Sequence, residues 1–178
     1  MTNNSGLQDM VTGEVLVRAL EEGRSFWQPV PANGFVRCLL ESTEVGAEHP
    51  FSIGTQTIAS GDCYVRTHAH DRHEEVIFFL EGRGRIEIDD GDTVARAEPG
   101  TLVYLGRNRR HSFINDSDAP LTFLWLLMPS GIEQFFARIG RPRQPDDPTP
   151  EPFARPENVA QIEAETVFAP PKPAGSKE

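Results

Sequence analysis

The sequence has few cysteines and little lysine, and it lacks a positive net charge. Only two cysteines, Cys38 and Cys63, occur in 178 residues, which is too few for the disulfide framework of a small secreted domain. Lysine and arginine total 17 against 27 acidic residues, which gives a net charge of −10. Such a chain repels phosphate backbones, so we expect no nucleic-acid partner. The tightest basic cluster, Arg107, Arg109 and Arg110, is too small for binding to duplex DNA.

Long apolar runs and targeting signals are also missing. The longest apolar run, residues 121–128 (LTFLWLLM), has eight residues, whereas a membrane-spanning helix needs about 20. The first residues, MTNNSGLQDMVTGE, contain neither the basic region nor the apolar region of a signal peptide. We therefore expect a cytoplasmic protein with no membrane partner, in which both cysteines are reduced.

The chain divides into four parts by its pattern of apolar residues, prolines and glycines. These are an N-terminal extension with a short helix (1–33), a β-rich region (34–128), a closing helix (129–140) and a proline-rich arm with a short helix and a disordered tail (141–178). The first helix is predicted within 12–22 by the helical spacing of its apolar residues, and the first ten residues are predicted to be disordered. In the closing helix, Ser130 and Glu133 have the spacing of a capping box.

Nine short apolar or alternating runs lie between residues 34 and 128. Turns rich in glycine, aspartate and proline separate them, for example EGRG and DDGD. No segment with a helical period intervenes, so the pattern indicates an antiparallel β-sandwich or barrel. The Asp-Gly step within 89–92 predicts a tight hairpin.

Histidines gather in one short stretch, THAHDRHEE. On a strand, His68 and His70 lie on the same face, and a hairpin to the next strand brings Glu75 beside them. His111, on a strand much farther along the chain, completes a set of three imidazoles and one carboxylate if the barrel closes. This set suits a divalent first-row transition metal, whereas structural zinc sites are closed and rich in cysteine. His73 is expected in the exposed connection.

The same residues resemble the two sequence motifs of the cupin family. The first motif is matched by Gly61, His68, His70, Glu75 and Gly82, and the second by His111 and Asn115. Gly106-Arg107-Asn108 stands where the family has Pro-x-Gly, and Asn can supply the left-handed turn conformation.

The resemblance covers about residues 34–128 and implies an all-β fold. That fold is an antiparallel double-stranded β-helix, the cupin or jelly-roll barrel, with short N- and C-terminal helices. It also implies a small single-domain (monocupin) metalloprotein similar to the quercetinase-like cupins. In such a protein His68, His70, Glu75 and His111 bind one divalent transition metal ion.

Side chains that share faces with these residues are predicted to surround the site. Alternation directs Arg66 into the barrel, where it can bind an anionic group of a substrate. A β-bulge or an ion pair with an acidic neighbour would instead turn it outward. Ile77, Phe79, Phe113 and Asn115 are predicted to line the substrate pocket, although aromatic side chains inside a barrel also serve as core.

A metal with open positions favours an enzyme over a storage or structural protein. The leading hypothesis is an iron(II)-type dioxygenase that acts on a small aromatic or diketone-like substrate, with Glu75 as base as well as ligand. Iron is expected first, and manganese, nickel, cobalt and zinc tolerate the same ligands. The alternatives are a non-oxidative metal-dependent isomerase or lyase, or a cupin that binds a small ligand without catalysis.

One predicted strand is apolar on both faces. Val76, Phe78 and Leu80 lie opposite the face that carries Glu75. A strand of this kind must be covered on its outside by a helix or by a second subunit. This predicts a homodimer.

Overall fold

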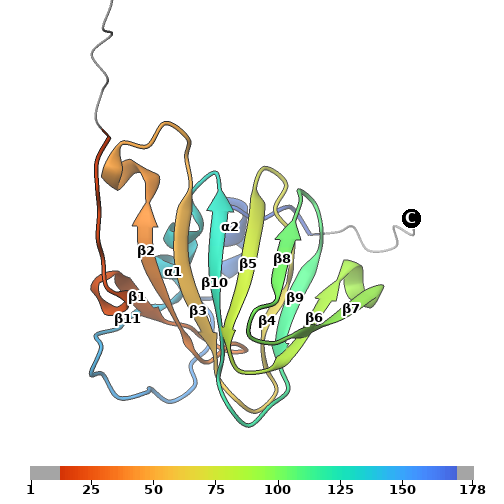
Figure 1. Cartoon of the computed structure of the whole chain (residues 1–178). Coiled ribbons are helices and arrows are strands. Elements are labelled where there is room, and N and C mark those ends of the chain that lie inside the picture. Colours follow the sequence, from red (N-terminus) through yellow and green to blue (C-terminus); the bar gives the residue numbers. More distant parts are fainter. Residues whose placement is uncertain (1–12, 172–178) are drawn as a thin grey trace, which may run out of the picture.

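The computed structural model describes residues 13–171, which form two antiparallel β-sheets and a few short helices (Figure 1). The larger sheet has the strand order β11–β1–β2–β3–β10–β5–β8, and the smaller sheet has the order β4–β9–β6–β7. The strands of the larger sheet are β1 (Arg24–Trp27), β2 (Phe35–Glu41), β3 (Ser52–Ile58), β5 (Glu74–Glu81), β8 (Leu102–Leu105), β10 (Leu121–Met128) and β11 (Arg141–Pro142). Those of the smaller sheet are β4 (Cys63–His68), β6 (Gly84–Ile88), β7 (Thr93–Ala97) and β9 (His111–Asn115). The helices are α1 (Ile132–Ile139) and α2 (Val159–Ala164), with 3-10 turns at Leu20–Glu22, Ser42–Val45 and Asp89–Gly91.

The predicted double-stranded β-helix is confirmed, and its nine strands β2–β10 coincide with the nine apolar runs of the sequence. Strand β10 shows why the pattern was readable, because its residues alternate between buried and partly exposed along its whole length. Alternate side chains of a strand point to opposite faces of the sheet. The predicted hairpin between β6 and β7 turns through Asp89, Asp90 and Gly91, all with positive φ.

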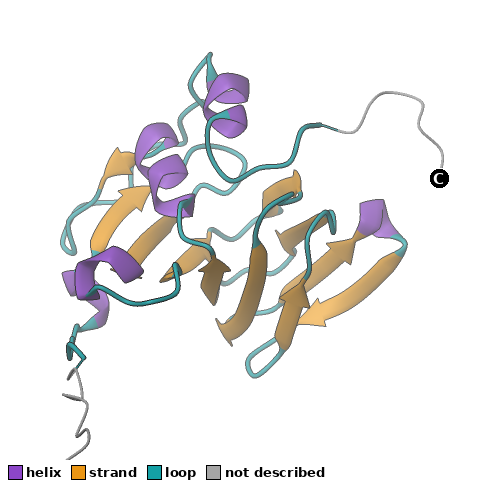
Figure 2. Ribbon diagram, turned by 90° about the horizontal axis from the view of Figure 1, so that it is seen from above, coloured by secondary structure: helices purple, strands orange, loops and turns teal. Residues whose placement is uncertain are grey.

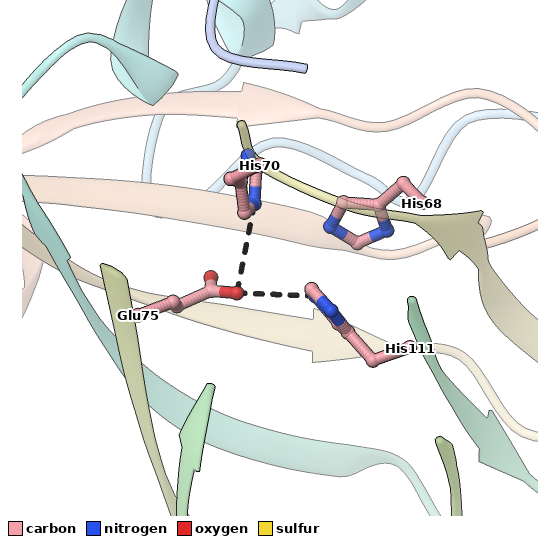
Figure 3. Close-up of side chains that lie close together, drawn as sticks. All are labelled: His68, His70, Glu75 and His111. Atoms are coloured by element: carbon pink, nitrogen blue, oxygen red, sulfur yellow. Dashed lines mark ion pairs between the residues drawn. The ribbon is translucent and has the colours of Figure 1, made fainter. Parts of the chain in front are cut away.

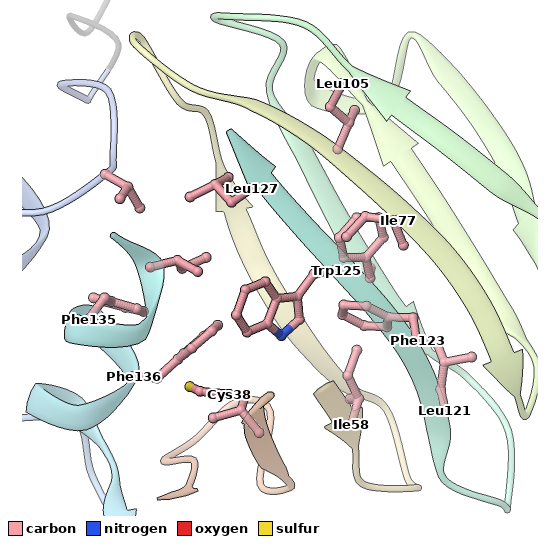
Figure 4. Close-up of a cluster of buried hydrophobic side chains, with 14 of the residues drawn as sticks. Cys38, Ile58, Ile77, Leu105, Leu121, Phe123, Trp125, Leu127, Phe135 and Phe136 are labelled. Carbon is pink, nitrogen blue, oxygen red and sulfur yellow. The ribbon is translucent and has the colours of Figure 1, made fainter. Parts of the chain in front are cut away.

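The core lies between the two sheets (Figure 4). Phe113 of the smaller sheet packs against Phe79 and Phe123 of the larger one, with ring centroids 5.8 and 5.0 Å apart. Helix α1 closes the neighbouring part of the core, where the ring centroid of Phe136 is 5.7 Å from that of Trp125. Figure 2 shows the two α-helices together on one side of the strands. The aromatic contacts therefore fix how the two sheets sit against each other.

The helix predicted within residues 12–22 is replaced by other structure. Residues 13–19 contain no helix, Leu20–Glu22 form a single 3-10 turn, and the chain then enters β1, which pairs with β2. Val15 and Val17 are 87% and 90% exposed, so no core surface is available against which an amphipathic helix could pack. Short helices without such packing are marginal in water.

The start of α1 also differs from the predicted capping box. Gly131, with φ 143°, is the N-cap residue instead of Ser130. The carboxylate of Glu133 still performs half of the predicted role, because its Oε2 accepts a hydrogen bond from the Gly131 N–H at 3.0 Å. The left-handed φ of Gly131 explains why the helix begins one residue later than expected.

The disorder predicted for the first ten residues falls outside the described part of the chain. The tail predicted to be free begins at residue 169, and only its part from residue 172 is outside; Ala169 is instead hydrogen-bonded to Ala69. Within residues 13–171, no helix is long and apolar enough to cross a membrane.

Candidate metal centre

Three strands bring the four predicted ligands together (Figure 3). His68 is the last residue of β4 and lies directly opposite His111, the first residue of β9. Glu75 comes from β5 in the other sheet, and His70 follows β4 in the connection. One ligand atom of each residue lies within 4.8 Å of the corresponding atoms of the others. The sequence therefore identified a true spatial cluster, although His111 lies at least 36 residues along the chain from each of the other three residues.

Three of the four donor atoms are buried and have no hydrogen-bond partner. Glu75 Oε2 is 3.1 Å from His111 Nε2 and 3.7 Å from His70 Nε2, but none of these atoms makes a hydrogen bond. A buried carboxylate without partners is costly, and a divalent cation among these atoms would satisfy all three. The donor set thus fits a divalent transition metal.

The other ring nitrogen of each histidine is held by a backbone carbonyl. A carbonyl oxygen can only accept a hydrogen bond, so Nδ1 carries the proton and Nε2 keeps its lone pair for a metal. The Nδ1–O distances are 2.8 Å for His68 to Arg66, 2.9 Å for His70 to Val167 and 2.9 Å for His111 to Arg109. All three imidazoles are therefore held in the tautomer that metal ligation requires.

The electrostatics of the cluster favour the forms that bind a metal. Burial, together with the neighbouring His111 and His70 rings, holds the pKa of His68 well below its usual value, so this imidazole is neutral at pH 7. Burial alone would raise the pKa of Glu75, but the approach of His111 and His70 more than offsets it and the pKa is lowered. Burial would lower the pKa of His70, but Glu75 raises it overall. A proton therefore competes with a cation at His70.

The turn between β8 and β9 supports the connection that carries His70. Asn108 has φ 62°, so the prediction that asparagine supplies the left-handed turn is confirmed. Its backbone N–H donates to the carbonyl oxygen of His70 at 2.8 Å. The second motif thus contributes backbone support as well as His111 to the same site.

A cavity of about 610 Å³ adjoins the cluster, and His68 and Glu75 are among the residues that line it. Of the predicted pocket residues, Phe113 and Arg66 also line this cavity. Ile77 and Phe79 do not, because both are completely buried in the core.

The prediction that Asn115 lines the pocket is wrong. Its side chain is fully buried, and its Nδ2 donates to the carbonyl oxygens of Ile58, Ala59 and Ala119 at 3.3, 2.9 and 2.8 Å. Its Oδ1 accepts from the backbone and hydroxyl of Ser117. With its amide used in this way, Asn115 fastens the β9–β10 turn to the end of β3.

Arg66 takes the outward alternative rather than the inward one. The β4–β9 ladder shifts register between Val65 and His68, and a bulge of this kind re-aims a side chain. The Arg66 side chain is 53% exposed, and its Nη1 is 3.9 Å from Glu163 Oε1 in helix α2. It therefore lies on the rim of the cavity, next to the C-terminal arm.

Sequence reasoning missed the contribution of that arm. Arg155, Glu163 and Phe168 line the cavity, and Val167 supplies a hydrogen bond to a predicted ligand. Only short-range patterns were available for this proline-rich region, and none of them indicates that the arm returns to the barrel. His73, which was expected to be exposed, is 9% exposed, and its ring lies beside Gly131 at the start of α1.

Known proteins resemble this chain in sequence and in fold. Residues 54–127 match the family model described as the cupin domain. The chain is 35% identical over 100 residues to an L-ectoine synthase of Vibrio campbellii, an alignment that covers 54% of this chain and 72% of that protein. It is 28% identical over 90 residues to the polyketide synthase CurC of Streptomyces cyaneus, with 51% and 57% covered.

Two solved structures share the fold at low sequence identity. The polyketide cyclase RemF from Streptomyces resistomycificus has a TM-score of 0.56 at 18% identity, covering 66% of this chain and 81% of that one. Oxalate decarboxylase of Bacillus subtilis has a TM-score of 0.52 at 16% identity, covering 63% and 29%. Because the cupin model spans the jelly-roll strands that bring His68, Glu75 and His111 together, this chain belongs to the cupin family.

Proposed function

We propose that this cupin is a metal-dependent enzyme that converts a small organic substrate without oxygen, by elimination, isomerisation or ring closure. The observation that carries the proposal is the cavity of about 610 Å³ beside the cluster of one carboxylate and three imidazoles. Pockets of this size hold small ligands. The relative at 35% identity is named a synthase, which favours a non-oxidative reaction over an oxygenation.

The metal would be held through Nε2 of His68, His70 and His111 and through Oε2 of Glu75. When bound, a divalent metal supplies Lewis-acid chemistry, because it polarises an oxygen of the substrate. Iron is the ion that we expect first, while manganese, nickel, cobalt and zinc suit the same donors.

Glu75 is the residue to which we assign proton transfer. Its pKa is lowered by the two neighbouring imidazoles, so it is ionised at neutral pH. While Oε2 faces the imidazoles, the side chain also lines the cavity. In the proposal, its Oε1 removes a proton from the substrate atom next to the polarised group, as a general base.

Two arginines on the cavity wall favour a substrate with an acidic group. Arg155 is only 14% exposed and makes an ion pair with Glu163 at 2.7 Å, while Arg66 Nη1 is 3.9 Å from the same carboxylate oxygen. One carboxylate is thus shared by two guanidinium groups, which leaves positive charge at the cavity. Arginine matches the geometry of a carboxylate or phosphate.

Part of the wall is apolar and aromatic, formed by Phe113, Phe123, Trp125 and Phe135. Such a wall excludes water and holds the apolar body of a ligand. We therefore propose a substrate with an apolar or ring-forming body, an oxygen for the metal and an acidic group for the arginines.

The iron(II) dioxygenase that the sequence first suggested is the competing proposal. The same apolar wall suits an aromatic or diketone-like substrate, and the same four ligands suit iron. The two proposals differ in one measurable requirement, because only the dioxygenase consumes oxygen in proportion to product.

The test begins with metal content. The purified protein is reconstituted with each of the five metals, and its stoichiometry is compared with that of His70→Ala. His49→Ala serves as the matched control, since His49 is exposed and outside the cluster. We expect one metal per chain in the wild type and in the control, and a loss of at least about tenfold in affinity for His70→Ala.

Candidate substrates with the proposed chemistry are then screened under air and under argon. We expect equal rates in both gases. Oxygen uptake matched to product formation would favour the dioxygenase, and a wild-type protein that binds no metal after reconstitution would refute both proposals.

We also propose that the protein is a homodimer. Phe78 and Leu102 are paired across β5 and β8, as are Val76 and Tyr104. Leu102 and Tyr104 are 62% and 59% exposed, and Phe78 is 37% exposed. An apolar face of this kind is typical of a subunit interface. Light scattering at micromolar concentration should give twice the chain mass, with dissociation by Leu102→Lys; a monomeric wild type would refute the proposal.

We place the reaction in the cytoplasm, as the sequence suggested. Both cysteines are free and buried in the structure, which suits a reducing compartment. Localisation of a tagged chain by fractionation tests this assignment.

A further inference from the structure

The segment Thr166–Ala169, which follows helix α2, lies directly against the candidate metal site. The backbone N–H of Ala169 donates to the carbonyl oxygen of Ala69, between the two histidines of the first motif, at 2.8 Å. The side chain of Val167 is buried, with 3% exposed. The C-terminal arm is thus fastened to the loop that carries His70.

Phe168 packs on the imidazoles themselves. Its ring centroid is 5.3 Å from that of His68 and 5.3 Å from that of His70. On its other side it contacts Phe135 of α1, with ring centroids 4.5 Å apart. The ring therefore fills the space between the closing helix and two of the predicted ligands.

His70 depends on this segment in a way that the other two imidazoles do not. His68 and His111 each bond through Nδ1 to the carbonyl two residues earlier in the chain, so their orientation is set locally. His70 follows the end of β4, and its Nδ1 instead bonds to the carbonyl of Val167, 97 residues away, at 2.9 Å. Only a correctly packed arm can supply that acceptor.

We propose that Thr166–Ala169 is a positioning element of the metal site. The Val167 carbonyl fixes the ring orientation and tautomer of His70, and Phe168 prevents the His68 and His70 rings from rotating. Outer partners of metal-binding histidines change metal affinity by about 10- to 100-fold when they are lost. The inference rests on the proposed metal binding but not on any particular reaction.

The test compares two shortened chains. One ends at Pro171 and keeps the whole segment, and the other ends at Glu165 and lacks both the Val167 carbonyl and Phe168. For each, the dissociation constant of Co²⁺ and the visible spectrum of the cobalt-loaded protein are measured. We expect the chain ending at Pro171 to match the full chain. The chain ending at Glu165 should bind cobalt about 10- to 100-fold more weakly, with an altered spectrum.

A general loss of stability is separated from a loss of positioning by Ile162→Ala. Ile162 is buried in α2, with 3% exposed, so this variant removes packing beneath the helix but leaves the segment Thr166–Ala169, with its carbonyl and phenyl ring, in place. Thermal unfolding of the metal-free proteins measures how much each change destabilises the fold. We expect Ile162→Ala to lower the melting temperature while the cobalt spectrum stays unchanged.

Phe168→Ala decides the question if the chain ending at Glu165 does not fold, because it keeps the entire backbone. We expect it to weaken cobalt binding several-fold and to shift the spectrum, with partial recovery in Phe168→Leu. Unchanged cobalt binding in the folded chain ending at Glu165, or in Phe168→Ala, would overturn the positioning role of the segment but not the proposed metal binding. So would an equal loss of affinity in Ile162→Ala. A full-length chain that binds no cobalt would overturn the proposed metal binding itself.

Discussion

Replacement of Asn115 separates a structural role from a role in the pocket. In Asn115→Ala, the carbonyl oxygens of Ile58, Ala59 and Ala119 lose the Nδ2 donor and the Ser117 N–H loses its acceptor, while the Ser117 hydroxyl still donates to Ala119. The Asn115 side chain has no exposed surface, and of its three donated hydrogen bonds the one to Ile58 is buried and the other two are partly buried. Each is worth about 1 kcal/mol, and a buried acceptor without a partner adds to the cost, so we expect a loss of about 3–4 kcal/mol in the free energy of unfolding.

Urea denaturation measures this loss. With a slope of about 2 kcal/mol per molar urea, the unfolding midpoint should fall by roughly 1.5–2 M. Asp118→Ala is the matched control, because Asp118 lies exposed in the same turn, and its effect should stay within about 0.5 kcal/mol. Metal stoichiometry of folded Asn115→Ala should equal that of the wild type, since the amide makes all its contacts away from the cluster. A loss below about 1 kcal/mol, or a folded variant without metal, would refute the reasoning.

Three further predictions concern stability. In Gly54→Ala the new methyl group would overlap the backbone carbonyl of Arg37, so the free energy of unfolding should fall by about 3 kcal/mol in urea denaturation. Gly106→Ala, with an ordinary 3.9 Å contact, should be close to neutral in the same assay. Burial raises the pKa of Cys38 to about 12. The contribution of the buried thiol to stability is therefore complete below pH 9, the usual thiol pKa, and declines above it. Iodoacetamide at pH 8.5 should alkylate Cys38 only when denaturant is present. Arg37 lowers the pKa of Glu21 below its usual 4.5. This pair therefore stabilises the fold above that pH, and the stabilisation is lost as the pH falls through the lowered pKa. In an acid titration followed by circular dichroism, the stability of Glu21→Gln should decline less steeply than that of the wild type.

The β-barrel and the metal-ligand cluster were readable from the sequence because both depend on local periodicity. Alternation along β10 follows from the direction of side chains on a strand. The same rule led us to place His68 and His70 on one strand face, but β4 ends at His68 and His70 lies in the connection beyond it. His111 required only that the barrel close, which the succession of turns already indicated. The hairpin that was predicted to bring Glu75 beside the histidines is wrong, because β4 and β5 belong to different sheets and Glu75 reaches the site from the opposite sheet. The identity of the chemistry does not follow from the same pattern, since one set of ligands serves several reactions.

The C-terminal arm could not be placed, for a physical reason. Its contacts with the barrel are a few backbone hydrogen bonds, such as Ala169 to Ala69, and side chains such as Val167 and Phe168. Backbone groups are the same at every position and carry no sequence signal. Strands β1 and β11, which are only four and two residues long, were not predicted for the same reason.

The errors among the pocket residues have a different origin, because alternation gives the face of a strand but not the depth. A strand rises about 3.3 Å per residue, so Phe113, two residues from His111, lies about 7 Å away, while Asn115 lies about 13 Å away. Phe113 lines the cavity and Asn115 does not. Phe79, four residues from Glu75, is likewise too deep.

Ile77 is only two residues from Glu75, so distance along the strand alone would place it at the cavity, yet it does not line it. It is paired across the ladder with Trp125, and the larger indole lines the cavity whereas Ile77 has no exposed surface. Depth along a strand therefore sets which side chains can reach a site, and the size of the cross-strand neighbour decides which of them does. The distance along the strand is available from the sequence once the ligands are known, but the identity of the cross-strand neighbour requires the strand register. The register is shifted by irregularities within the β4–β9 and β5–β10 ladders, and the pattern of apolar residues does not predict these shifts.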